Sequence, residues 1–201
     1  PRIGYQFIYP GIGYGGSCFP KDVKALTRTA AASGMDMQLL TAVDEVNERQ
    51  KGHLVSLIRR HYDGHLAGKV FALWGLSFKP GTDDMREAPS RVIMEALWEA
   101  GARIQAYDPE AMQEVERIYG HRADLQLAGT RDAAIQGADA LIICTEWQHF
   151  RAADFDHLAR QLSDRVLFDG RNVYDPDTVG GYGLVYYGIG RGASLKPPVK
   201  E

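Results

Sequence analysis

Cysteine is scarce in this sequence, whose 201 residues include only Cys18 and Cys144. Two distant thiols are not the framework of a disulfide-rich secreted domain, so we predict free thiols and a cytoplasmic protein. Long apolar runs are missing too, and none approaches the ~18 residues that a membrane span needs. No block of one charge occurs, because 23 Lys and Arg face 26 Asp and Glu. This balance argues against nucleic acid as a partner.

The composition that remains is that of an ordinary globular protein, with 45% hydrophobic and 24% charged residues. Disorder, collagen and coiled coil are therefore excluded as the main architecture. A chain of this size buries roughly 70% of its unfolded surface and needs no disulfide or metal to fold. The sequence begins at Pro1, and its richest motif lies within the first 25 residues. Because loops of this kind are carried by a scaffold, we expect an upstream segment to support it.

Helical spacing of apolar residues extends from Val23 to about His61, with an interruption at Gly34. A short linker containing two glycines follows, at residues 62–68. We place a boundary there. The first unit, residues 1–66, is predicted to contain the glycine-rich loop and a long central helical segment. The second unit, residues 67–201, is predicted to be a separate domain.

Strand and helix patterns alternate after the linker. Strands are expected at 70–78, 102–107, 125–127, 140–145 and 166–169, and helices at 89–100, 109–119, 130–136 and 155–162. This alternation predicts an α/β fold with a doubly wound, mostly parallel, Rossmann-like sheet preceded by the long helical segment. Ligands of such sheets bind at the carboxyl ends of the strands.

The first candidate site is the sequence GIGYGGSCFPKD, residues 11–22. Its four glycines let the backbone approach a ligand and turn N–H groups toward anions. Cys18 lies just ahead of a predicted helix, where a thiolate is stabilised, and Lys21 adds positive potential. Asp22, one turn further, faces the same side and is a candidate base or water-orienting group. The alternative is a glycine turn with a buried Cys18 and an N-capping Asp22.

The second candidate site is GLSFKPGTDDMREAPS, residues 75–90, which follows the first strand. It lacks the G-x-G-x-x-G spacing of a dinucleotide fingerprint. Lys79 and Arg86 instead bring two cations to a strand end and a helix start, which suits a phosphate or pyrophosphate. The alternative is a turn in which Asp83 or Asp84 caps the helix and Arg86 pairs with an acid.

The third candidate is Arg171, in the FDGRN motif after the last predicted strand. Its position at another carboxyl end directs it toward the same crevice, although single arginines there are often surface residues. Asp108, after the second strand, resembles the ribose-binding acid of dinucleotide folds. Without the glycine fingerprint, a role in capping the turn before Pro109 is the simpler interpretation. Cys144, inside an apolar strand, is predicted to be inert core.

Histidine patterns do not predict a metal centre or a hydrolase. His61 and His65 are four residues apart, but the intervening Asp-Gly pair breaks a helix. We therefore predict no metal site. A cysteine hydrolase needs a histidine to activate Cys18, and neither His53 nor His149 stands in such a context.

Six segments in this order resemble one family. They are RIG, GGSCFPKD, FKPGTDDMREAPS, AYDP, TEW and FDGRN. Together they span nearly the whole chain, which resembles the central helix and C-terminal domain of the UDP-glucose/GDP-mannose dehydrogenase family. The resemblance implies that the N-terminal NAD-binding domain of this family is not part of this sequence.

The resemblance implies a two-step oxidation of UDP-glucose to UDP-glucuronate that consumes two NAD. Cys18 attacks the intermediate aldehyde to give a thiohemiacetal, whose oxidation leaves a thioester that water cleaves. Asp22 handles water or protons. GDP-mannose is the alternative substrate, although FKPGTDDMREAPS together with TEW looks more like the UDP-glucose branch. A further alternative is that the isolated chain is a non-catalytic module for nucleotide-sugar binding and dimerisation.

Individual roles are implied by the matching positions. The implied substrate contacts are Arg2, Tyr9, Gly11, Gly13, Tyr14, Gly15, Phe78, Lys79 and Arg171, with Arg2 entering the site of a neighbouring subunit. The implied cofactor contacts are Cys18, Phe19, Pro20 and Lys21 beside the nicotinamide, and Arg86 at the NAD pyrophosphate. The resemblance also implies a homodimer through the central helix, which matches the apolar face at 43–58.

Overall fold

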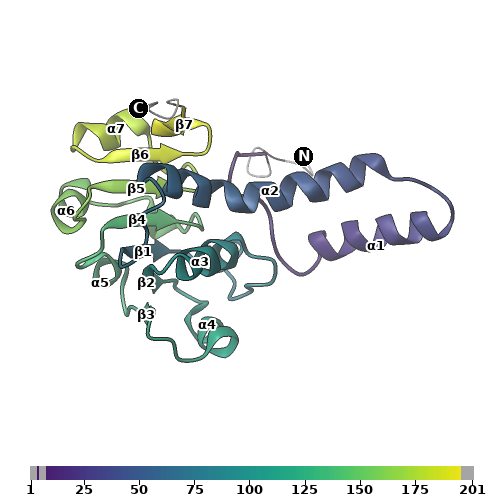
Figure 1. The fold of residues 1–201 in the computed structure, drawn as a ribbon, viewed down its shortest axis with the longest axis horizontal. Helices are drawn as coiled ribbons and strands as arrows, with labels where there is room; N and C mark the ends of the chain where they lie inside the picture. The colour runs from purple at the N-terminus through teal and green to yellow at the C-terminus, as the bar shows by residue number, and fades with distance from the viewer. Residues whose placement is uncertain (1–3, 5–7, 196–201) are drawn as a thin grey trace.

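The computed structural model describes Gly4 and residues 8–195. A loop of glycines leads into α1 (Phe19–Ala32) and α2 (Gln38–His61), which fold back on each other as a hairpin arm beside the sheet (Figure 1). The break predicted at Gly34 is confirmed, and this residue takes the left-handed φ of +75°. The first helix begins earlier than Val23 because Pro20 suits a first helical turn.

The sheet confirms the predicted fold class. Its strands in the described part of the chain are β1 (Val70–Trp74), β2 (Arg103–Tyr107), β3 (Leu125–Leu127), β4 (Ala140–Ile143), β5 (Val166–Asp169), β6 (Val185–Gly188) and β7 (Arg191–Gly192). They follow the order β3-β2-β1-β4-β5-β6-β7, and every pair is parallel except β6 with β7. The order of winding reverses between β1 and β4, where doubly wound sheets leave a crevice at the carboxyl edge.

Helices cover both faces of this sheet (Figure 1). They are α3 (Pro89–Glu99), α4 (Met112–Tyr119), α5 (Arg131–Ile135), α6 (Phe155–Gln161) and α7 (Pro176–Gly181), with 3₁₀ turns η2 (Gln148–Phe150) and η3 (Ala193–Leu195). Alternate residues of each strand enter two cores. In β1, Phe71 and Leu73 pack with α2, α3 and α4, whereas Ala72 and Trp74 pack with α5, α6 and α7.

Helix α2 is divided between core and arm. Leu54 and Ile58 are fully buried in the cluster that contains the β1 side chains. Leu39 and Val46, in the N-terminal half, are 77% and 54% exposed. The C-terminal part of the apolar face expected to meet a second subunit is thus covered by the chain itself. Only the N-terminal half leaves apolar surface for a partner.

Two predicted strands, 70–78 and 140–145, end early in the structure, at Trp74 and Ile143. The next residue after β1, Gly75, has a φ of +92° and turns the chain out of the sheet. No element was predicted after residue 172, yet α7, β6 and β7 follow there. Two glycines in α7 and the two-residue length of β7 weaken the periodic signal on which prediction depends.

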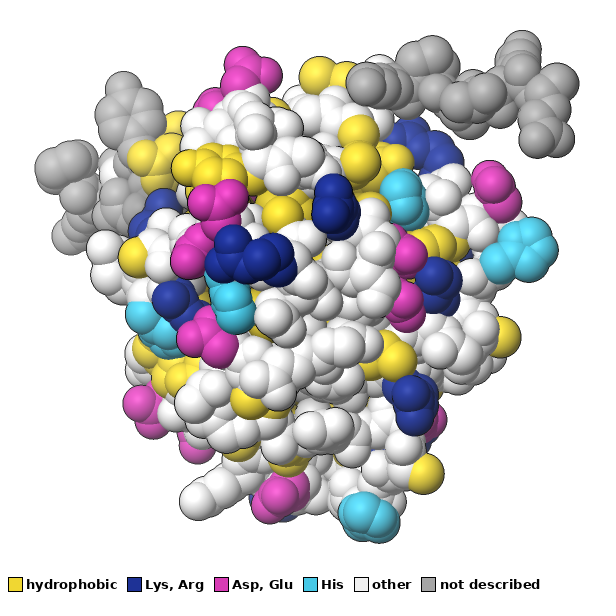
Figure 2. All heavy atoms as spheres, turned by 90° about the vertical axis from the view of Figure 1, so that its left-hand side faces the viewer, with side chains coloured by type: hydrophobic (Ala, Val, Ile, Leu, Met, Phe, Trp, Pro, Cys, Tyr) yellow, Lys and Arg dark blue, Asp and Glu magenta, His cyan; other side chains and the backbone are white. Residues whose placement is uncertain are grey.

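The side of the molecule remote from the arm shows acidic, basic and histidine side chains scattered singly or in mixed groups (Figure 2). Within the described part of the chain, no helix combines the length and the apolar character that crossing a membrane requires.

Candidate functional site

The glycine loop crosses the carboxyl edge of the sheet and meets the FDGRN motif there. Ile12 is fully buried, and its N–H donates to the carbonyl of Gly170 at 3.1 Å. A Cβ at Gly11 would lie only 2.9 Å from Nη1 of Arg171. The first candidate site therefore touches the third, although only the FDGRN motif follows a strand end.

The same loop then reaches the second candidate site. The N–H of Gly16 donates to the carbonyl of Arg86 at 2.8 Å. Gly16 has a φ of +93°, and a Cβ there would lie 2.9 Å from the Phe78 ring. A Cβ at Gly15 would collide with the Glu87 carbonyl. Only glycine allows both approaches, and Phe78 consequently lies against the end of the loop that carries Cys18.

Cys18 is exposed and occupies the N-cap of α1. Its Sγ lies 3.5 Å from the Ser17 hydroxyl oxygen. Asp22 is one turn into the helix, since its N–H donates to the Cys18 carbonyl at 2.8 Å. Its carboxylate lies 3.4 Å from the Lys21 amine, and both side chains are largely exposed. The alternative of a buried Cys18 with Asp22 as N-cap is therefore not what the chain forms.

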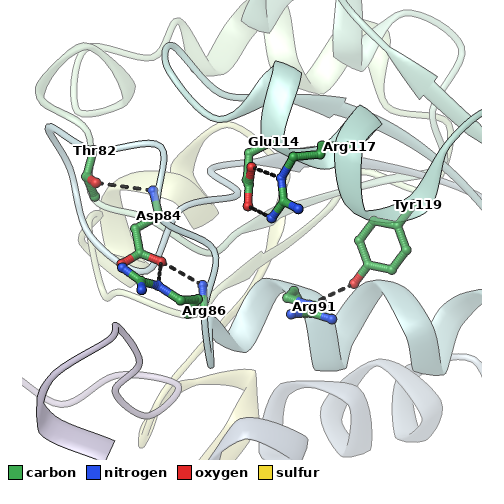
Figure 3. Close-up of polar contacts among 7 residues, drawn as sticks. All are labelled: Thr82, Asp84, Arg86, Arg91, Glu114, Arg117 and Tyr119. Atoms are coloured by element: carbon green, nitrogen blue, oxygen red, sulfur yellow. Dashed lines mark hydrogen bonds and ion pairs between the residues drawn. The ribbon is translucent and has the colours of Figure 1, made fainter. Parts of the chain in front are cut away.

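Arg86 is held in a fixed orientation by its neighbour Asp84. Nε and Nη2 donate to the two carboxylate oxygens at 2.9 and 2.8 Å, and the Asp84 N–H donates to Thr82 Oγ1 at 3.1 Å (Figure 3). Hydrogen bonds from Arg86 lower the pKa of Asp84. The pKa of Arg86 is raised, mainly by its hydrogen bonds to Asp84. The expected acid pairing of Arg86 is confirmed, whereas α3 is not capped by Asp83 or Asp84.

A groove of about 590 Å³ lies between the loop, α1 and the start of α3. Its charged lining consists of Lys21, Lys24, Arg28, Arg86, Glu87 and Arg91. Sequence reasoning identified Lys21 and Arg86 but missed three of the cations. Two of the missed cations, Lys24 and Arg28, could have been found from their spacing. They lie three and seven residues after Lys21, which puts all three on one helix face. Arg91 is oriented by a residue that does not line the groove, since its Nε donates to the Tyr119 hydroxyl at 3.1 Å (Figure 3).

Arg171 is tied to an acid that sequence reasoning did not single out. Its Nη2 and Nε lie 2.9 and 2.7 Å from the two carboxylate oxygens of Glu146, in the TEW segment after β4. Its own N–H donates to Asp169 at 2.9 Å. The Nη2 contact is a hydrogen bond and the Nε contact is an ion pair, and together they orient the guanidinium as well as neutralising it. Arg171 and Lys79, which lies 5.4 Å from the Phe78 ring, both stand at the carboxyl edge.

Two simpler predictions are confirmed. Asp108 is buried and accepts hydrogen bonds from the N–H groups of Leu76 and Glu110 at 2.7 and 2.9 Å and from Trp147 Nε1 at 3.2 Å. It therefore holds turns together, as its capping interpretation predicts. Cys144 is 5% exposed, and burial raises the pKa of its thiol, which makes it inert.

The remaining expected contacts are distributed along the loop. Tyr9 is 67% exposed, Gly13 packs against α2, and the Tyr14 ring meets Phe19 edge-on at 4.8 Å. Arg2 lies outside the described residues. Across Gly4 and residues 8–195, no three His, Cys, Asp or Glu side chains are grouped so that they could hold a metal ion.

The turn after β1 is not a dinucleotide cradle. Gly75 packs against the chain beyond β4, and a Cβ there would lie 2.5 Å from Thr145 Cβ. A pyrophosphate has no room at that point. The cationic groove beside Cys18 is a better chemical match for such an anion, because it combines lysine and arginine side chains with an open surface.

Comparison with known families identifies two matching segments. Residues 72–176 match the UDP-binding domain of the UDP-glucose/GDP-mannose dehydrogenase family, and residues 1–49 match the central domain of that family. The first segment contains the FKPG, TEW and FDGRN motifs, and the second contains the loop with Cys18.

Individual relatives agree. A UDP-glucose 6-dehydrogenase of Pseudomonas aeruginosa is 49% identical over 94% of this chain, and one of Rhizobium meliloti is 41% identical over 94%. The solved structure of a UDP-glucose dehydrogenase from Pyrobaculum islandicum is 32% identical, with a TM-score of 0.78 over 94% of this chain. The chain spans 43% of the length of both curated relatives and 40% of that solved chain. On these matches, the chain belongs to the UDP-glucose/GDP-mannose dehydrogenase family.

Proposed function

We propose that this chain is the thiol-bearing, nucleotide-sugar-binding part of an NAD-dependent UDP-glucose 6-dehydrogenase. The observation that carries the proposal is the position of Cys18. Its thiol is exposed at the end of a glycine loop whose backbone is hydrogen-bonded to both the Arg86 turn and the FDGRN motif. The loop that ends in this proposed nucleophile therefore contacts the two distant segments that carry Arg86 and Arg171.

UDP-glucose is the proposed substrate, with GDP-mannose as the alternative. Support comes from the match to a UDP-binding domain and from the relatives at 49% and 41% identity, both of which are UDP-glucose 6-dehydrogenases. We assign Lys79 and Arg171 to the sugar and phosphate groups, because a diphosphate needs cationic partners. Phe78 supplies an apolar surface between them and the loop.

NAD, when bound, supplies the acceptor for the hydride removed at each oxidation. We assign Lys21 and Arg86 to its pyrophosphate, and Lys24 and Arg28 extend the same positive surface. The fixed orientation of Arg86 by Asp84 favours this role, because a guanidinium that is already aligned loses less conformational freedom on binding an anion.

Cys18 accounts for the retention of the aldehyde. Its thiolate adds to the aldehyde carbon, forming a C–S bond, and the carbonyl oxygen takes a proton to give a thiohemiacetal. Loss of a hydride from that carbon and of the hydroxyl proton leaves a thioester. Water then breaks the C–S bond, which yields the carboxylate and returns the thiol. Asp22, one turn from Cys18, is the proposed group that orients the water or accepts its proton.

The decisive test replaces Cys18 by serine in the complete dehydrogenase. Turnover should fall on the order of 10³-fold or more, because the hydroxyl is a far weaker nucleophile. UDP-glucose binding, measured by calorimetry, should persist. Cys144→Ala is the matched control, since it removes the buried thiol, and it should keep normal turnover. Formation of UDP-glucuronate at an undiminished rate by Cys18→Ser would refute the nucleophile.

A second candidate function is nucleotide-sugar binding without turnover by this chain alone. The match of residues 72–176 to a UDP-binding domain favours it. Calorimetry of the 201-residue chain with UDP-glucose tests this binding. Lys79→Ala and Arg171→Ala should each weaken binding. Arg103→Ala, at the opposite end of β2, should not. Equal affinity in all variants would remove Lys79 and Arg171 from the site.

A further inference from the structure

Side chains on one face of α2 form hydrogen bonds with the backbone of the glycine loop. Asn47 is 4% exposed, and its side chain accepts from the N–H of Tyr14 at 2.8 Å and donates to the carbonyl of Tyr14 at 3.1 Å. Gln50 Nε2 donates to the carbonyl of Gly11 at 2.7 Å. These two side chains stand one turn apart and together satisfy three backbone groups of a loop that belongs to no helix or strand.

The fit between helix and loop is close. A Cβ at Gly13, whose φ is +94°, would lie 2.9 Å from Asn47 Oδ1 and 3.2 Å from Lys51 Cγ. The Asn47 amide uses both its donor and its acceptor on one residue, so a shift of the loop by one position would lose both hydrogen bonds. The contact consequently fixes the register of the loop relative to α2.

Lys51 extends the same face to the Arg86 turn. The residue is 1% exposed, and its amine lies 2.8 Å from both Glu48 and Glu87. Burial opposes its charge, but the hydrogen bonds to the two glutamates outweigh this effect and raise the pKa of Lys51. Glu87 itself has a φ of +54°, directly after the carbonyl of Arg86 that binds Gly16. An ion pair between the buried Lys51 amine and the more exposed Glu87 carboxylate thus anchors a strained turn beside the glycine loop.

We propose that Asn47 and Lys51 are positioning residues of the dehydrogenase reaction. Helix α2 holds the thiol loop through Asn47 and the Arg86 turn through Lys51 and Glu87. It thereby fixes Cys18 relative to Arg86, although neither Asn47 nor Lys51 has a role in binding or chemistry. This inference rests on the proposed function and deepens it, because a thiol and a hydride acceptor must be aligned within fractions of an ångström.

The test uses Asn47→Ala in the complete dehydrogenase, with Arg49→Ala as the matched control. Arg49 is on the same helix, and its side chain is 68% exposed. We expect kcat of Asn47→Ala to fall by about 10–100-fold through misplacement of the thiol. The KM for UDP-glucose should change less than about threefold, because the proposed sugar and phosphate contacts lie elsewhere. Arg49→Ala should keep normal kcat.

A second measurement is the rate at which iodoacetamide alkylates Cys18, taken as a function of pH. If Asn47 only stabilised the fold, this pH dependence would stay unchanged in the folded variant. A displaced thiol should show an altered pH profile in Asn47→Ala at a temperature where thermal denaturation shows the protein fully folded. Asn47→Asp keeps the acceptor for the Tyr14 N–H, and it should fall between alanine and the natural residue. Gln50→Ala, which removes the single partly buried hydrogen bond to Gly11, carries the same test in a variant with little risk to folding.

Unchanged kcat and alkylation profiles in both Asn47→Ala and Gln50→Ala would overturn the proposal. Activity losses that match the fraction of unfolded protein would also overturn it. The proposed function has its own check in the same preparation. If Cys18→Ser keeps turnover, the chemistry is wrong, whereas an inactive Cys18→Ser beside a fully active Asn47→Ala rejects only the positioning role.

Discussion

Single glycines control how closely segments approach at the carboxyl edge of the sheet. Gly16 lets the loop lie on the Phe78 ring, and Gly75 lets the turn after β1 lie on Thr145. Both have left-handed φ angles, of +93° and +92°. These residues combine a backbone conformation that other side chains resist with a space that no side chain fits. Replacing either glycine should therefore lower the free energy of unfolding for two reasons, backbone strain and steric overlap.

Gly75→Ala tests this expectation. We expect the free energy of unfolding to fall by about 2–4 kcal/mol, from a left-handed backbone plus overpacking against Thr145. Gly81→Ala is the matched control, since Gly81 has a φ of +77° but open space around it, and it should cost only about 1–2 kcal/mol. Urea unfolding measures both. Equal losses in the two variants would show that the contact with Thr145 has no energetic weight.

At the scale of elements, buried charge connects α2 to the turn before α3. Lys51 lowers the pKa of Glu87 by hydrogen bonding, and the exposed Lys24 contributes less. The folded state therefore binds fewer protons at this carboxyl than the unfolded chain does. The resulting stability is present above the ordinary glutamate value of 4.5 and is lost as pH falls through the lowered folded pKa.

Glu87→Gln should remove that pH dependence. We expect lower stability near pH 7, because the buried Lys51 amine loses one of its two carboxylate partners, and a flatter decline of stability below about pH 4.5. Glu45→Gln, an exposed change on α2, should leave the decline as it is in the natural protein. Urea unfolding at a series of pH values measures both curves. A decline of the same steepness in Glu87→Gln would mean that other carboxylates cause it.

At the scale of the whole molecule, the arm leaves apolar surface uncovered. A recess of about 330 Å³ on α2 is lined by Tyr14, Ala42, Val43, Val46, Asn47 and Gln50. Leu39 and Val46 stand exposed on the same half of the helix. Exposed apolar patches of this kind are typical of association surfaces. We propose this half of α2 as the contact of the homodimer, in place of the whole face at 43–58.

Sedimentation of the complete dehydrogenase tests the dimer. The natural protein should sediment as a dimer, and the double change Leu39→Lys with Val46→Lys should shift it toward monomer, because burying two ammonium groups is unfavourable. Val185→Lys changes an exposed apolar residue on β6 and should leave the dimer intact. A natural protein that stays monomeric at high concentration would contradict the assignment.

The sequence by itself determined the fold class, the break at Gly34, the buried Cys144 and the motifs that follow strand ends. Each depends on local periodicity or on a residue with restricted conformation, which neighbouring residues suffice to reveal. Only the tertiary structure decided that the Asn47 side chain hydrogen-bonds to the backbone of Tyr14, 33 residues away, and that Glu146 orients Arg171. It also decided that half of α2 is covered by the chain itself. Such contacts have no local pattern, because the packing of helices on the sheet is what brings their partners together.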